Sequence, residues 1–186
     1  MSGPPPVPPV TNPGVGGEKV KIDSKAIALT AVFAALYAVL VLALAGISFE
    51  IVQVRVADAL IPLSMVFGLP AVFGVTIGGA VANIASPMPS VMTDVALGSL
   101  ANFIAGIVAW KIGASKVKKN LNEFFGCLTA TVIITFIVGT YLAWLTEMEL
   151  WIWWLGIGIG SIISITILGY ILVRILQRLA AKTSFT

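Results

Sequence analysis

Few residues of this chain could bind a polar small molecule, and the first of them lie in Ser48–Leu60. There Gln53 and Arg55 alternate with valines, a period of two that predicts a short extended lid segment with one polar and one apolar side. Asp58 follows at the start of a helix, where a carboxylate suits the positive end of the helix dipole. The alternative is an ordinary loop in which Arg55 pairs with Glu50 or Asp58, and Asp58 caps the helix.

Further polar residues flank the loop that follows. Asn83 lies near the end of one apolar stretch, Asp94 lies at the start of the next, and Asn102 lies two turns after Asp94 on a similar face. Taken singly, Thr93 or Asp94 is typical of a helix cap, and an amide within a span is typical of a bond between helices. Their convergence on one end of the molecule predicts a binding site. The expected binding residues are Glu50, Gln53, Arg55, Asp58, Asn83, Asp94 and Asn102.

Tryptophans gather in the same region of the predicted fold. Most of them are typical of the aromatic belt at a membrane interface. We expect one of them, Trp151, to stack on a flat ligand. The group comprises Trp144, Trp151, Trp153 and Trp154.

The elements that position these residues are apolar helices. The chain is 59% hydrophobic and 10% charged, with a mean hydropathy of +1.05. In hydrocarbon every backbone polar group must be satisfied within the protein, so long uncharged stretches must be helical. These stretches cover 26–49, 59–93, 95–110, 124–146 and 150–173.

Six membrane spans are predicted. As one helix, 59–93 would be about 52 Å long, far more than the ~30 Å hydrocarbon core. Gly68-Leu69-Pro70 divides it, because Pro is favoured in a first turn and breaks a helix interior. The result is an all-α membrane bundle in residues 23–186, with spans at about 24–47, 57–68, 70–85, 93–113, 122–146 and 151–178.

The basic residues predict the orientation of the bundle. Six spans place both termini on one side, and ten of the eleven Lys and Arg residues then fall on that side, leaving only Arg55 opposite. The positive-inside rule makes that side cytoplasmic. We therefore expect a multi-pass protein of the cell membrane whose binding residues face outward, and no nucleic-acid partner. The proline-rich segment 1–22 is expected to be a disordered cytoplasmic tail.

Several chemistries are excluded by what the sequence lacks. It contains no histidine, which removes His-based metal sites and Ser-His or Cys-His nucleophiles. It also has no phosphate-binding Gly-x-x-x-x-Gly-Lys loop. We expect no cofactor, no metal and no catalysis, and uphill transport would need energy from another subunit. Lone Cys127 is expected to be a packing residue.

Small residues recur at helical spacing. Gly74-x-x-x-Gly78 and Gly156-x-Gly158-x-Gly160 predict close helix approach. Ala28, Ala31, Ala35 and Ala38 form a smooth stripe on the first helix. This stripe either packs against the other helices or forms a docking surface for another membrane subunit.

Two segments resemble the QueT family. They are Ile51–Leu60 (IVQVRVADAL) and Ile77–Pro87 (IGGAVANIASP), followed by Asp94 and Gly98. This family comprises S components, the substrate-binding subunits of energy-coupling factor (ECF) transporters, assigned to the uptake of queuosine precursors.

The resemblance implies a division of labour. The S component captures substrate outside the cell, and a transmembrane coupling subunit with two cytoplasmic ATPases drives its delivery. It also implies that Ala31 and Ala35 contact the coupling subunit, and that the ligand is a 7-deazaguanine such as preQ0 or preQ1. The alternatives are an S component for another vitamin or nucleobase and, from another class, a non-transporting membrane scaffold.

Overall fold

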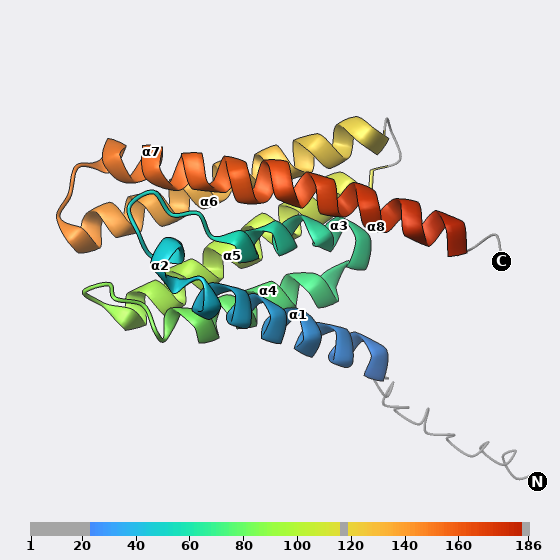
Figure 1. Ribbon diagram of the computed structural model, residues 1–186, viewed down its shortest axis with the longest axis horizontal. Coiled ribbons are helices and arrows are strands. Elements are labelled where there is room, and N and C mark those ends of the chain that lie inside the picture. The colour runs from blue at the N-terminus through green and yellow to red at the C-terminus, as the bar shows by residue number, and fades with distance from the viewer. Residues whose placement is uncertain (1–22, 116–118, 184–186) are drawn as a thin grey trace, which may run out of the picture.

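The computed structural model describes residues 23–115 and 119–183, and within these ranges the chain is all-helical (Figure 1). The predicted tail, 1–22, lies outside the described residues. Helix α1 (Ser24–Ala43) begins at Asp23, whose side chain accepts a hydrogen bond from the Lys25 amide at 3.1 Å. It ends at Leu44, where a change of direction leads into the short helix α2 (Ala45–Ser48).

The predicted second span is a tight 3-10 helix, η1 (Val56–Leu63), followed by the single turn α3 (Ser64–Phe67). Pro62 within η1 lacks an amide hydrogen, which disfavours a regular α-helix. The chain then reverses at Gly68, whose φ of 68° favours glycine, and this is the position at which the sequence suggested a break. Pro70 lies in the first turn of α4 (Leu69–Asn83).

Helix α4 packs closely on α1. An added Cβ at Gly74 would lie 2.3 Å from the Phe33 Cβ, and one at Gly78 would lie 2.6 Å from the Ala34 carbonyl oxygen. Only glycine permits this approach, so the packing role predicted for Gly74 and Gly78 is confirmed.

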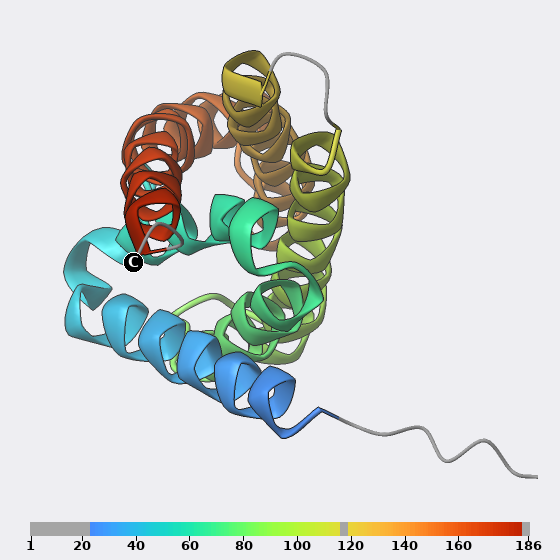
Figure 2. The ribbon, with the colours of Figure 1, turned by 90° about the vertical axis from the view of Figure 1, so that its right-hand side faces the viewer.

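The remaining helices are long. They are α5 (Val91–Gly113), α6 (Lys119–Thr146) and a continuous run made of α7 (Leu150–Ser161), the π-helical segment η2 (Ile162–Gly169) and α8 (Tyr170–Thr183). Seen end on, η1 and α3 lie inside a ring formed by the longer helices (Figure 2). Every residue of η1 after Val56 is buried, so this short element forms the centre of the bundle.

Four helices are long and apolar enough to cross a membrane: Ser24–Ala43, Val91–Gly113, Leu121–Thr146 and Leu150–Ala180. Two further apolar helices, Val56–Phe67 and Leu69–Asn83, are shorter. Their outward surfaces carry many exposed large apolar side chains, as expected of helices that face lipid.

The two ends of the bundle differ. The connections 49–55, 84–90 and 147–149 lie at one end, here called the Asp94 end (Figure 1). The start of α1, the turn between α3 and α4, and the end of α8 lie at the other, here called the Lys25 end.

Candidate ligand-binding site

Buried polar side chains from several elements gather toward the Asp94 end. Each is at most 6% exposed, although the surrounding helices are apolar. Together they form what we call the polar cluster. Its members are Tyr37 of α1, Arg55 of the connection 49–55, Asp58 of η1, Asn83 of α4, Asp94 and Asn102 of α5, and Tyr141 of α6.

The first turn of α5 positions Asp94 without using its side chain as a cap. Ser90 is the N-cap, and its Oγ accepts a hydrogen bond from the Thr93 amide at 3.4 Å. The alternative in which Thr93 or Asp94 caps this helix is therefore wrong. The Asp94 carboxylate is instead free to accept a hydrogen bond from the Tyr141 hydroxyl at 2.5 Å.

Asp58 is held in a similar way at the start of η1. The Tyr37 hydroxyl donates a hydrogen bond to Asp58 Oδ1. Arg55 forms no ion pair with Asp58 or Glu50, all three of which are described residues. The ordinary-loop alternative, which rested on such a pair, is therefore not what the structure shows.

The connection 49–55 turns Gln53 and Arg55 inward. Gln53 and Arg55 are buried, whereas Val52 between α2 and Gln53 is exposed. Burial alternates as the sequence suggested, since Val54 between Gln53 and Arg55 is only partly buried, and the Arg55 backbone is extended, although the segment is not paired as a strand in the described residues. Gln53 Nε2 donates to the Ser48 carbonyl oxygen, which closes the segment against α2.

Two glycines of helix α7 allow this connection to pack closely against the helix. A Cβ at Gly156 would lie 2.1 Å from the Ile51 carbonyl oxygen, and one at Gly160 would lie 1.9 Å from the Gln53 carbonyl oxygen. The sequence predicted that these glycines bring two helices together. They instead bring a helix against irregular backbone, which in turn presses Gln53 and Arg55 into the bundle.

Two asparagines join α4 to α5 below the connection. Asn83 Nδ2 donates to the Asp94 carbonyl oxygen at 3.0 Å, and Asn102 Nδ2 donates to the Val75 carbonyl oxygen at 3.2 Å. Gly79 lies against Asn102, since an added Cβ there would be 2.5 Å from Asn102 Nδ2. The amides therefore bridge helices and also line the polar cluster.

Three buried polar atoms of the cluster have no hydrogen-bond partner: Arg55 Nε, Asn83 Oδ1 and Asp94 Oδ2. A buried polar atom left without a partner destabilises a protein by about 1–3 kcal/mol. Such atoms are rare in folded proteins, and each requires an explanation. One donor and two acceptors in a single cluster are the complement of a small polar ligand.

Arg55 brings a permanent charge to the cluster. Burial disfavours the charged guanidinium, whereas the neighbouring Asp58 and Asp94 carboxylates favour it and help to raise the pKa of Arg55 above its ordinary value. The guanidinium also lies over the Phe49 ring, with Cζ 5.4 Å from the ring centroid. Arg55 is therefore a fixed cationic donor among carboxylates.

Two of the residues expected in the site are exposed, unlike the buried members of the polar cluster. Glu50 is exposed, and Trp151 is 60% exposed on α7. The buried tryptophan is Trp153, which is 2% exposed and donates its indole hydrogen to Thr146 Oγ1 at 2.7 Å.

Sequence reasoning missed Tyr37 and Tyr141. A signal for them was present, because a tyrosine within an apolar span needs a partner for its hydroxyl. The chain has only three tyrosines, and two of them donate to the two aspartates of the site.

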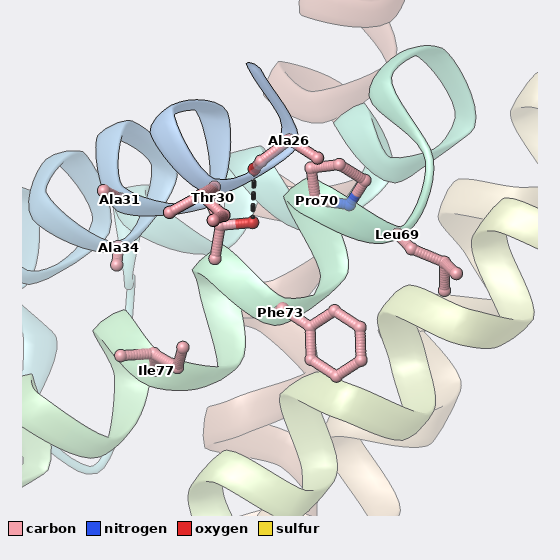
Figure 3. A pocket seen from close by; sticks show the side chains of 9 residues that line it. Ala26, Thr30, Ala31, Ala34, Leu69, Pro70, Phe73 and Ile77 are labelled. Atoms are coloured by element: carbon pink, nitrogen blue, oxygen red, sulfur yellow. Dashed lines mark hydrogen bonds between the residues drawn. The ribbon is translucent and has the colours of Figure 1, made fainter. Parts of the chain in front are cut away.

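The outer face of α1 carries the alanine stripe. Ala28, Ala31 and Ala35 are exposed and Ala38 is partly buried, so most of the stripe does not pack against the other helices. Beside it, α1 and α4 enclose an apolar hollow of about 710 Å³, into which Thr30, Ala34, Pro70, Phe73 and Ile77 also project (Figure 3).

Comparison with known proteins now identifies the chain. A model of the QueT transporter family matches residues 27–178, which span every element of the polar cluster. The chain belongs to the QueT transporter family. Comparisons with curated proteins and with solved structures give no significant match. Membership confirms the resemblance seen in the sequence and indicates that this chain is a membrane transporter component.

Proposed function

We propose that this QueT-family chain is the S component of an ECF transporter and that the polar cluster binds a 7-deazaguanine such as preQ0 or preQ1. The observation that supports this most directly is the set of unpartnered buried atoms on Arg55, Asn83 and Asp94. A 7-deazaguanine has a carbonyl oxygen that accepts from a guanidinium and N–H groups that donate to carboxylate or amide oxygens. Binding would give each of these atoms a partner.

The cluster is also suited to a flat ligand that is transferred from water into a buried site. It is enclosed by helices, so the hydrogen bonds it makes would be stronger than in solvent. Tyr37 and Tyr141 supply aromatic surface in the same place. Asp58 and Asn102 extend the polar lining toward the centre of the bundle.

Binding is tested on the purified full-length protein. Small molecules released from it on denaturation are identified by mass spectrometry, and affinity for preQ0 and preQ1 is measured by calorimetry. Arg55→Ala should weaken binding roughly 5- to 150-fold, the equivalent of about 1–3 kcal/mol for an unpaired polar partner. Arg178→Ala, which removes an exposed arginine of α8, is the matched control and should bind normally.

The outcome separates the functions still open. Release of another vitamin or nucleobase would make the chain an S component of different specificity. No released molecule, together with no measurable binding of preQ0 or preQ1, would favour a non-transporting scaffold.

We further propose that α1 docks on the ECF coupling subunit, which works with two cytoplasmic ATPases. Exposed Ala31 and Ala35 lie one turn apart, and their small side chains allow another helix to approach closely. Because the chain has no phosphate-binding loop of its own, uphill transport would draw its energy from such a partner.

The proposed orientation has six spans with both termini in the cytoplasm. It is supported by the concentration of basic residues in the segments of the Lys25 end and by the direction of the helices in Figure 1. With buried Cys127 replaced by Ser, an impermeant thiol reagent applied to intact cells should label Pro87→Cys and leave Ser115→Cys unlabelled. Both chosen positions are exposed. Labelling of Ser115→Cys would show that the orientation is the reverse of the one proposed.

A further inference from the structure

The hydrogen bonds around Asn83 fix which of its side-chain atoms remains free. The atom facing the Asp94 carbonyl oxygen, at 3.0 Å, must be the amide nitrogen, because a main-chain carbonyl can only accept. Asn83 Oδ1 then points elsewhere, and it is buried without a partner. Asn83 therefore contributes a free acceptor.

Tyr141 fixes Asp94 in a comparable way. A phenol has one hydrogen to donate, and the Tyr141 hydroxyl donates it to Asp94 Oδ1 at 2.5 Å. Asp94 Oδ2 is left buried without a partner. The aspartate is thus held by its helix through the main chain and by Tyr141 through the carboxylate.

Gly98 shows that these groups meet at one place on α5. It lies one turn after Asp94, hence on the same face. An added Cβ at Gly98 would lie 2.4 Å from Asn83 Nδ2 and 3.2 Å from the Tyr141 hydroxyl. Asn83 reaches this place from α4 and Tyr141 from α6, so the two free acceptors belong to one hydrogen-bonded unit.

We propose that Asn83 Oδ1 and Asp94 Oδ2 together accept the neighbouring ring N–H and amino N–H of a 2-amino-4-oxopyrimidine edge, with Tyr141 as the positioning residue for Asp94. The proposal rests on the proposed function, which supplies a ligand with that edge. Two acceptors select a ligand edge made only of donors. An edge that presents an unprotonated ring nitrogen would leave one acceptor unpaired and add a repulsive contact.

The test compares ligands that differ by one amino group. Calorimetry on the purified full-length protein uses 7-deazaguanine and 7-deazahypoxanthine, which lacks the exocyclic amine. The wild-type protein should prefer 7-deazaguanine roughly ten- to a hundredfold, the range expected when one acceptor loses its donor. In Tyr141→Phe this preference should fall below about threefold, chiefly through weaker 7-deazaguanine binding.

Tyr170→Phe is the matched control. Tyr170 lies in α8, where its ring packs edge-on against Phe124, and it is remote from Asp94 in the fold. This variant should keep the full preference for the amino group. Asp94→Asn, which changes one oxygen to a donor with little change in size, is the second variant if Tyr141→Phe fails to fold, and it should also lose the preference.

Each outcome decides a separate point. Equal wild-type affinity for the two ligands would overturn the acceptor pair while leaving the proposed function intact. Equal weakening of both ligands in Tyr141→Phe would make Tyr141 a structural residue only. If the wild type binds none of 7-deazaguanine, preQ0 and preQ1, the proposed function fails, and the acceptor pair is then decided by guanine against hypoxanthine, which differ by the same amino group. Binding of neither would overturn both.

Discussion

The polar cluster and the hollow beside the alanine stripe differ in the chemistry of their lining, although both are formed by apolar helices. The cluster lies inside the bundle and holds buried groups with unused hydrogen-bonding capacity. The hollow lies on the outer face of α1 and α4 and is lined almost entirely by carbon (Figure 3). The polar cluster therefore offers directional hydrogen bonds, and the hollow offers only an apolar surface to which a partner can fit by shape.

The difference explains why the two regions suit different partners. Inside a low-dielectric bundle, a few unpaired donors and acceptors discriminate strongly between small ligands. A lipid-facing groove of small residues gives no such discrimination, but it lets a helix approach closely. Variants in one region should leave the function of the other unchanged, and the predictions below test this separation.

The largest effect is expected from Ala31→Leu combined with Ala35→Leu. The larger side chains would hold a partner helix away from α1, so assembly with the coupling subunit and substrate uptake should be lost. Because both alanines face outward, the purified variant should bind ligand with wild-type affinity. Co-purification, uptake and calorimetry measure these three properties.

The control for that variant is Val32→Leu with Val39→Leu. Both valines are exposed on α1 and already branched, so little volume is added. If the variant with Ala31→Leu and Ala35→Leu misfolds or loses ligand binding, the stripe contributes to internal packing.

The next largest effect is expected from Gly98→Ala. Its Cβ would need the space of Asn83 Nδ2, 2.4 Å away, so the contact between Asn83 and Asp94 must open. Ligand affinity should fall more than about tenfold, since a hydrogen bond to a charged group contributes about 1.5–3 kcal/mol. Gly158→Ala, whose nearest neighbouring atom would be 3.4 Å away, should bind normally. Normal binding by Gly98→Ala would mean that this part of α5 is not in the site.

A smaller effect on stability is expected from Tyr37→Phe. The variant leaves Asp58 Oδ1 buried without its donor, which should lower the free energy of unfolding by about 1–3 kcal/mol. Since Tyr37 is not part of the acceptor pair, the preference for an exocyclic amino group should persist. Thermal unfolding in detergent and the ligand comparison measure the two properties; loss of the preference would extend the recognition unit to Asp58.

The smallest effect is expected from Trp151→Ala. Trp151 is 60% exposed, whereas the polar cluster is buried, so ligand affinity should change by less than about twofold. Trp153→Phe is the informative partner, because it removes a 2.7 Å bond to Thr146 and should destabilise the protein by about 1 kcal/mol. Clear loss of affinity in Trp151→Ala would restore the stacking role suggested by the sequence.

Much of the candidate site was predictable because its residues are polar in apolar surroundings. Arg55, Asp58, Asn83, Asp94 and Asn102 stand out in the sequence for that reason, and all five are buried in one cluster. Tyr37 and Tyr141 do not stand out, since tyrosine is also common at membrane interfaces. The pairing of each tyrosine with one aspartate joins residues 21 and 47 positions apart, which no local pattern reveals.

The least predictable feature was whether a given side chain is buried or exposed. Glu50 and Arg55 lie in the same connection, yet one is exposed and the other buried. That outcome depends on Gly156 and Gly160 of α7, which accept the backbone of the connection. Sequence alone could assign these glycines to packing but could not name what they pack against.

Apolar helices, the break at Gly68 and membership of the QueT transporter family all follow from local composition and motif order, because hydrocarbon forces backbone hydrogen bonding within each segment. The choice of which polar atoms pair and which remain free follows from contacts between segments. Ser90 rather than Asp94 caps α5, and Tyr141 holds the Asp94 carboxylate. Those choices depend on how α4, α5 and α6 meet at Gly98, and they leave the acceptors of Asn83 and Asp94 without a partner.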